Sequence, residues 1–184
     1  MRIFAVFAVA AVSLALSGCY VQSVHPLHTE DKLIVDPGFV GTWADAKEPG
    51  ESTVIRAGGG NSYKLTFTDD GVSSEYDGHL VQLGETVCLD MFPAQARQEG
   101  CGDDFMPLHI IFRIQRDGDE MKVASVNHEW LDKMLENKEV NIPHFRYEGR
   151  IVLSMETEQL QHVITGFAGI EEAFEEPTLL RRLE

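Results

Sequence analysis

The sequence predicts a mostly β protein, in which about eight antiparallel strands form an up-and-down barrel and short helices are inserted late in the chain. From residue 38 onward, short runs of alternating polarity are separated by turn residues at spacings of roughly ten, which is the pattern of antiparallel sheet. Two stretches with helical periodicity follow, both after residue 126. A ladder of hairpins either splits into a sandwich or closes into a barrel, and closure leaves no exposed strand edge.

Length and charge limit the classes of protein. The 184 residues, of which 43% are hydrophobic, suit one domain with a core of its own. The formal net charge is −15, from 30 acidic and 15 basic side chains. Binding to phosphates requires clustered Lys and Arg, so this balance excludes nucleic acid as a partner and disfavours electrostatic attachment to an anionic membrane.

The chain is expected to have three parts: a signal peptide over residues 1–18, a tether over 19–37, and the barrel domain over 38–184. Residues 3–16 form an apolar run after Arg2, with Ser13 as the only polar residue. A membrane-spanning helix needs about 20 apolar residues, so we prefer a signal peptide to the alternative of a retained membrane helix.

The predicted tether is polar and contains two prolines, and its apolar residues are spread too thinly for a core element. Thr29 is expected to begin one helical turn over 30–32. His25 and His28 fall in this segment and are expected to belong to a solvated turn.

The clearest predicted strand is 63–68, in which Tyr63, Leu65 and Phe67 share one face. Glycine-rich turns are predicted on both sides of it, at 58–61 and 69–71. Inward positions such as Leu65, Phe67, Ile110 and Phe112 are bulky, which predicts a filled interior. The strands are expected to be centred near residues 42, 54, 65, 77, 88, 111, 123, 151 and 180.

Two helical segments are predicted. Asn127 is expected to cap the first, which presents Trp130, Leu131, Met134 and Leu135 on one face. The second is expected over residues 160–174, with a break at Gly166 and an end before Pro177; a last strand should follow over 178–183.

The tetrapeptide Leu16-Ser17-Gly18-Cys19, at the end of the apolar run, resembles a bacterial lipobox. The resemblance implies that the Cys19 sulfur is alkylated with diacylglycerol and that the chain is then cut between Gly18 and Cys19. Each buried methylene contributes about 0.8 kcal/mol, so the acyl chains would keep the protein on its membrane. By similarity to Gram-negative lipoprotein sorting, Tyr20 after the lipidated cysteine implies the outer membrane.

The two other cysteines, Cys88 and Cys101, are an even pair in a chain expected in an oxidising compartment. A disulfide closing this loop would stabilise the fold by about 3 kcal/mol. Two separate thiols remain the alternative.

The segment Gly41-Thr42-Trp43, preceded by residues 36–40, resembles the Gly-x-Trp start of a lipocalin. This resemblance implies a barrel whose closed end is plugged by Trp43, with an arginine of a late strand packed across the indole. Arg181 and Arg182 on the last predicted strand are the candidates. The alternative is that Trp43 is an ordinary core aromatic residue.

No catalytic motif or metal-ligand spacing stands out, and no cofactor or metal is expected. Asp90 is expected to face away from the apolar side of its strand, where it would be solvated. The stretch from His128 to Asp132 lacks the second histidine of a zinc-protease helix. The acidic face formed by Glu171, Glu172, Glu175 and Glu176 is expected to be solvated.

These observations predict a non-catalytic lipoprotein, held by lipid on Cys19 at the periplasmic face of the outer membrane. A filled interior favours binding to an envelope protein partner. The alternatives are a carrier of a small apolar ligand and, less favoured, an envelope hydrolase whose site is assembled from distant residues.

Overall fold

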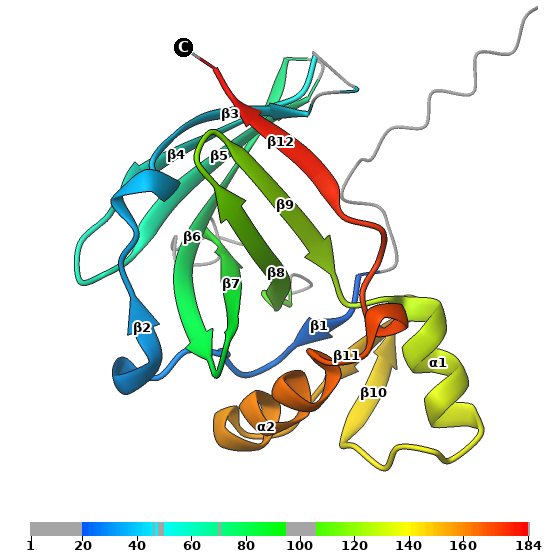
Figure 1. The fold of residues 1–184 in the computed structure, drawn as a ribbon. Coiled ribbons are helices and arrows are strands. Elements are labelled where there is room, and N and C mark those ends of the chain that lie inside the picture. The colour runs from blue at the N-terminus through cyan, green and yellow to red at the C-terminus, as the bar shows by residue number, and fades with distance from the viewer. Residues whose placement is uncertain (1–19, 46, 48–49, 70, 95–105, 184) are drawn as a thin grey trace, which may run out of the picture.

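The protein forms a closed barrel of eight antiparallel strands, seen in a computed structural model that describes residues 20–45, 47, 50–69, 71–94 and 106–183 (Figure 1). The predicted fold class is confirmed. Seven consecutive strands run up and down, and the last strand inserts between β9 and β3 to close the wall. The barrel strands are β3 (Gly41–Asp45), β4 (Ser52–Ala57), β5 (Tyr63–Asp69), β6 (Val72–Leu83), β7 (Thr86–Pro93), β8 (His109–Asp117), β9 (Glu120–Ser125) and β12 (Thr178–Arg182).

Three short strands extend the wall beside β8. They are β1 (Gln22–Ser23), β10 (His144–Tyr147) and β11 (Arg150–Leu153), the last being the strand expected near residue 151. β9 ends at Ser125, which pairs with Phe112, so the first residues of β8 are left to pair with β1. β1 in turn pairs in parallel with β11. A further short strand, β2 (Leu33–Ile34), pairs with β6.

Two helices lie beside β10 and β11 on one side of the barrel (Figure 1). α1 (His128–Glu136) begins as predicted, because the Asn127 side chain accepts a hydrogen bond from Trp130 N at 3.0 Å. α2 (Thr157–Phe167) continues through Gly166, so the predicted break there is wrong. Leu160, Ile164 and Phe167 form one buried stripe, and their packing outweighs the low helix propensity of a single exposed glycine.

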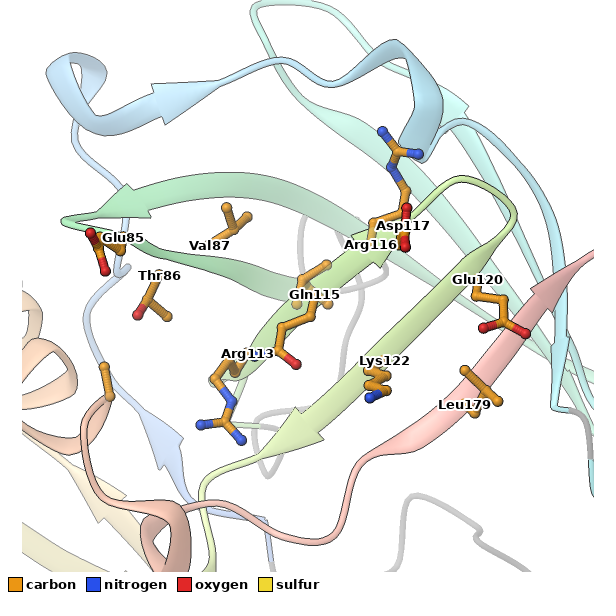
Figure 2. A pocket seen from close by; sticks show the side chains of 12 residues that line it. Glu85, Thr86, Val87, Arg113, Gln115, Arg116, Asp117, Glu120, Lys122 and Leu179 are labelled. Carbon is orange, nitrogen blue, oxygen red and sulfur yellow. The ribbon is translucent and has the colours of Figure 1, made fainter.

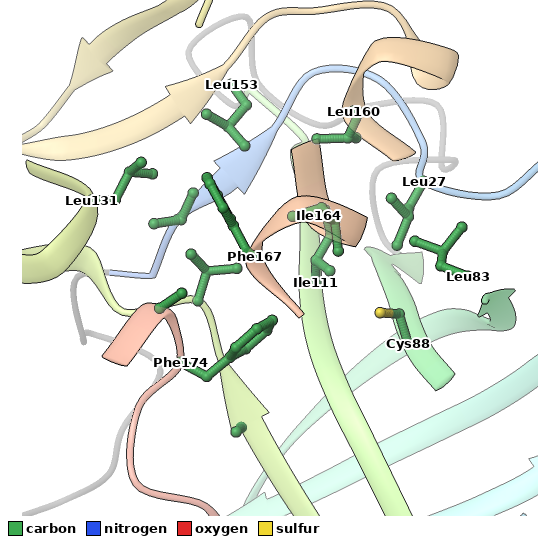
Figure 3. Close-up of a cluster of buried hydrophobic side chains, with 14 of the residues drawn as sticks. Leu27, Leu83, Cys88, Ile111, Leu131, Leu153, Leu160, Ile164, Phe167 and Phe174 are labelled. Carbon is green, nitrogen blue, oxygen red and sulfur yellow. The ribbon is translucent and has the colours of Figure 1, made fainter. Parts of the chain in front are cut away.

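Buried apolar side chains form two separate clusters, one on each side of the barrel wall. The inner cluster lies inside the barrel and consists of Phe39, Trp43, Ile55, Tyr63, Leu65, Leu80, Leu89, Met91, Ile114 and Met121. The outer cluster lies between the outer face of β6, β7 and β8 and the two helices (Figure 3). Its members are Val21, Leu27, Val81, Leu83, Cys88, Ile111, Ala124, Val126, Leu131, Ile151, Leu153, Met155, Leu160, Ile164, Phe167, Ala173 and Phe174.

Residues 20–37, expected to be a tether, pack against the barrel, so that expectation is wrong for the described part of the segment. Val21 is 3% exposed and Leu27 is fully buried in the outer cluster. α2 holds the backbone there: Thr157 Oγ1 donates to Pro26 O and Gln161 Nε2 to Leu27 O, each at 2.8 Å. The apolar residues are too sparse to form a core of their own, but each fills a place in a core built by other elements.

Residues 1–19, with the predicted signal peptide and Cys19, and residues 95–105, with Cys101, lie outside the described residues. Among the described residues, no helix has the length and apolar character needed to cross a membrane.

Candidate functional site in the barrel interior

The barrel encloses a cavity of about 890 Å³. Its walls are mainly apolar, with contributions such as Ile55, Leu65, Phe67, Phe112 and Val123 from several strands. Pockets of this size and character hold small organic ligands in many proteins.

The prediction of a filled interior is therefore wrong. Leu65 and Phe112 do face inward, but they form walls around a space instead of closing it. Part of the reason is Gly78 on β6, which pairs across the sheet from Tyr63 and Met91. A Cβ at Gly78 would overlap Leu65 Cδ1, so the missing side chain lets Leu65 lie against the wall.

One end of the cavity is closed by Phe39 and Trp43, both of which are buried. Trp43 Nε1 donates to Phe39 O at 3.0 Å. The Arg182 guanidinium lies 4.4 Å from the centre of the Trp43 ring, in cation–π geometry, and donates to Val40 O at 2.7 Å and to Gly38 O. These contacts hold Phe39, Trp43 and Arg182 together; we call this group the plug.

Of the two arginines proposed for the plug, only Arg182 packs on Trp43. Arg181 is exposed and pairs with Glu120, its Nε lying 3.2 Å from Glu120 Oε1. The alternation of a strand accounts for the difference, because neighbouring residues point to opposite faces.

A turn at residues 36–39 is fastened over this closed end. Asp36 accepts hydrogen bonds from Arg116 Nε at 2.8 Å and from Gly38 N at 2.8 Å. The hydrogen bond from Arg116 lowers the pKa of the Asp36 carboxyl. Tyr63 joins this turn to the barrel, because its hydroxyl accepts from Asp36 N at 2.8 Å.

At the opposite end, carboxylates surround the cavity. We call this set the acidic rim; it consists of Asp45, Glu51, Asp69, Glu129, Glu175 and Glu176. Tyr20 also lines the cavity and packs edge-on against Phe112, with ring centroids 5.9 Å apart. Burial, and to a smaller extent the charge of Glu51, raises the pKa of Tyr20.

A buried polar cluster lies outside the barrel wall, and the sequence analysis missed it. Asp90 was expected to be solvated, yet it is only 1% exposed. Its strand does turn Asp90 outward, as predicted, but residues 27 and 28 cover it there. Asp90 Oδ2 accepts from His28 Nδ1 at 2.7 Å and from Leu27 N at 2.8 Å, and Asp90 Oδ1 lies 2.7 Å from His109 Nδ1.

Two opposing effects act on the Asp90 carboxyl. Burial alone would raise its pKa, but the hydrogen bonds from His109 and His28 outweigh burial and lower the pKa to about 2. The ring of His79 stacks on that of His28, with centroids 3.9 Å apart. The charged carboxylate thus fastens the N-terminal segment, by which we mean residues 20–28, to β7.

The hydrogen bonds that the described residues give the His28 and His109 rings both go to the Asp90 carboxylate. Within the same part of the chain, no group of three or more His, Cys, Asp or Glu side chains is arranged to hold a metal ion. No sequence motif contains His28, Asp90 and His109, because they come from three separate segments. They meet only because the segment with His28 packs on the outer face of β7.

Cys88 has no disulfide bond among the described residues, and it is fully buried in the outer cluster near Leu27 and Leu83 (Figure 3). Burial raises its pKa to about 12, which makes it a poor nucleophile. Its expected partner, Cys101, lies outside the described residues, so the disulfide stays a prediction.

A second hollow of about 560 Å³ lies on the outer surface of β8 and β9 (Figure 2). Its lining mixes both signs of charge, and several of these charges are already paired. Arg116 is paired with Asp36 and Glu120 with Arg181. Arg113 lies over the Phe174 ring at 4.2 Å. We therefore regard the barrel cavity as the stronger candidate site.

Comparison with protein-family models, curated proteins and solved structures found no match to this chain.

Proposed function

We propose that this protein is a non-catalytic binding protein that holds one small apolar ligand inside its barrel and is tied to a membrane by lipid on Cys19. The observation that carries the proposal is the cavity of about 890 Å³, closed at one end by Phe39 and Trp43. An eight-stranded barrel has room for its own side chains or for one small ligand, and here the side chains leave the space open.

The lining supports an apolar ligand. Phe67, Phe112 and Val123 offer apolar surface, and burial of a ligand there would contribute roughly 25 cal/mol per Å² of apolar area. A few polar groups, including Thr53 and Ser125, are placed to orient a ligand. The filled interior that favoured an envelope protein as the partner is not found, so ligand carriage becomes the preferred role.

The predicted anchor suits this role. Tyr20 lines the cavity, and consecutive Cα atoms are about 3.8 Å apart, so a lipid on Cys19 would leave the chain beside the acidic rim. The barrel would then present its open end to the leaflet from which an apolar ligand arrives. The resemblance of residues 16–19 to a lipobox, together with Tyr20, supports a position at the periplasmic face of the outer membrane.

Binding is tested by titrating the protein, made without its leader and with Cys19→Ser, with the neutral fluorescent probe N-phenylnaphthylamine. We expect saturable binding to one site. Val123→Trp places a large ring in the cavity and should abolish binding, whereas Val72→Trp, at a position 71% exposed, should leave it unchanged. Thermal unfolding of both variants checks that they fold. Absence of binding to the parent protein, or equal binding by Val123→Trp, would refute the proposal.

The anchor is tested separately in a Gram-negative host by fractionation. The full chain should sediment with the outer membrane, and its N-terminal peptide should begin at Cys19 and carry added acyl mass. An N-terminal peptide without added acyl mass would count against lipidation.

A further inference from the structure

We propose that the ligand of the barrel carries an uncharged hydroxyl or carbonyl group on its apolar body, and that the Thr53 hydroxyl binds this group beside Trp43. The inference rests on the proposed function and adds the chemistry of the ligand. It follows from two buried hydroxyls, those of Thr53 and Ser125, which border the cavity and form no hydrogen bond within the part of the chain that the structure describes.

Both residues are more than nine-tenths buried and yet line the cavity: Thr53 is 8% exposed and Ser125 is 9% exposed. Two other buried polar side chains, those of Ser23 and Asp90, form hydrogen bonds with their surroundings. The Thr53 and Ser125 side chains form none with any other described residue. Neither oxygen is sealed off from accessible space, so each faces the cavity that its residue lines.

The strand register places Thr53 at the closed end of the cavity. Thr53 on β4 pairs with Trp43 on β3 and with Phe67 on β5. Directly opposed residues on one face of a sheet have Cβ atoms about 5 Å apart, so the hydroxyl lies between two aromatic side chains. The Trp43 ring has one donor, Nε1, which already donates to Phe39 O. Neither neighbouring side chain therefore offers Thr53 a hydrogen bond.

Ser125 is placed differently. It is the last residue of β9, and the polar stretch 127–129, which also lines the cavity, follows it at the open end. Water that enters through this opening can form hydrogen bonds with the Ser125 hydroxyl. Thr53 is therefore the hydroxyl whose hydrogen bonding depends on the ligand.

The position of Thr53 selects the kind of group that it binds. A ligand that fills the closed end takes the place of water there, and a pure hydrocarbon would leave the hydroxyl unpaired at a cost in free energy. A hydroxyl or carbonyl restores the hydrogen bond, because threonine can both donate and accept. An ionised group would lose its hydration between two aromatic rings, which costs more than the hydrogen bond returns.

The test uses three ligands with one hexylphenyl body: 4-hexylphenol, 4-hexyltoluene and 4-hexylbenzoate. Each displaces N-phenylnaphthylamine from the Cys19→Ser protein at neutral pH. The methyl compound leaves water more readily than the phenol, so the quantity compared among variants is the ratio of the phenol affinity to the methyl-compound affinity. We expect the benzoate to bind more weakly than the phenol.

Matched variants locate the effect. Thr53→Val replaces the hydroxyl by a methyl group and should lower the ratio about tenfold, while 4-hexyltoluene still binds at least as tightly as to the parent. Thr53→Ser keeps the hydroxyl and should keep the ratio. Thr66→Val makes the same exchange at a position that pairs with Val54 and does not line the cavity, and should leave the ratio unchanged. Ser125→Ala should change it less than about twofold.

The outcomes separate this inference from the proposed function. If none of the three ligands displaces the probe, the proposed function fails and this inference fails with it. If the ligands bind but Thr53→Val keeps the parent ratio, or only Ser125→Ala lowers it, ligand carriage stands and the role of Thr53 is refuted. A benzoate that binds as tightly as the phenol would refute the uncharged group. Should Thr53→Val not fold, Thr53→Ala against Thr53→Ser gives the same comparison.

Discussion

The inner and outer clusters of this protein are both apolar, but they are packed differently. The inner cluster lines an open space of about 890 Å³, whereas the outer cluster fills the region between the barrel wall, the two helices and the N-terminal segment. The barrel is therefore stabilised largely from outside. The barrel interior holds a cavity, so the filled core of the protein lies outside the barrel. Segments 20–28 and 126–174 provide much of that core.

The largest expected effect comes from a truncation in the outer cluster. Leu160→Ala, at a fully buried position of α2, should lower the free energy of unfolding by about 4 kcal/mol, because it leaves a new cavity in a filled core. Leu89→Ala, in the wall of the existing cavity, should lower it by about 2 kcal/mol. Urea denaturation measures both values, and equal losses would remove the distinction between the clusters.

The polar cluster should contribute the next largest effect. In Asp90→Asn, the amide cannot accept from both His28 and His109 as the carboxylate does, so the free energy of unfolding should fall by about 2 kcal/mol. The exposed Asp117→Asn is the control and should change it by less than about 0.5 kcal/mol. A small effect of Asp90→Asn would mean that the N-terminal segment is held without this carboxylate.

The same carboxyl predicts a dependence on pH. Its pKa is lowered in the folded state, so its contribution is fully present above the ordinary Asp value near 4 and is lost as the pH falls through about 2. Between these limits, the parent protein should lose stability more steeply than Asp90→Asn. Thermal unfolding across this range gives the comparison, and parallel curves would show that Asp90 is not the group responsible.

The plug of the inner region should be sensitive to one arginine and not to its neighbour. Arg182→Ala removes the cation–π contact with Trp43 and the hydrogen bonds to Val40 and Gly38, and should lower the free energy of unfolding by about 1.5 kcal/mol. Arg181→Ala breaks only an exposed pair and should lower it by less than about 0.5 kcal/mol. Chemical denaturation of both variants decides between them.

The smallest effect should be stabilising and confined to the outer region. A Cβ at Gly166 meets no atom within 4 Å, and the glycine lies in α2. Gly166→Ala should therefore raise the free energy of unfolding by about 0.8 kcal/mol. Probe affinity should stay the same, since α2 covers the outer cluster; a change in affinity would show that the two regions are coupled.

The sequence was a good guide to the strands of the barrel, because alternation and turn residues are local signals. It also identified Trp43 as the residue at the closed end, and it narrowed the arginine packed on Trp43 to Arg181 or Arg182. It failed where the outcome depends on what covers a surface: Asp90 and Leu27 are buried by each other's segments, 63 residues apart in the chain. The cavity was missed because bulky inward residues such as Leu65 suggest filling, whereas their packing on Gly78 is a property of the folded wall.

The two tryptophans allow the central claim to be tested directly, since Trp43 lines the cavity and Trp130 packs on Phe167 beside the outer cluster. The measurement is fluorescence quenching by a dodecanol with bromine on its terminal carbon. In Trp130→Phe, which leaves Trp43 alone, we expect saturable quenching; in Trp43→Phe, which leaves Trp130 alone, we expect none. Equal quenching of both tryptophans, or an unquenched Trp43, would contradict a ligand inside the barrel.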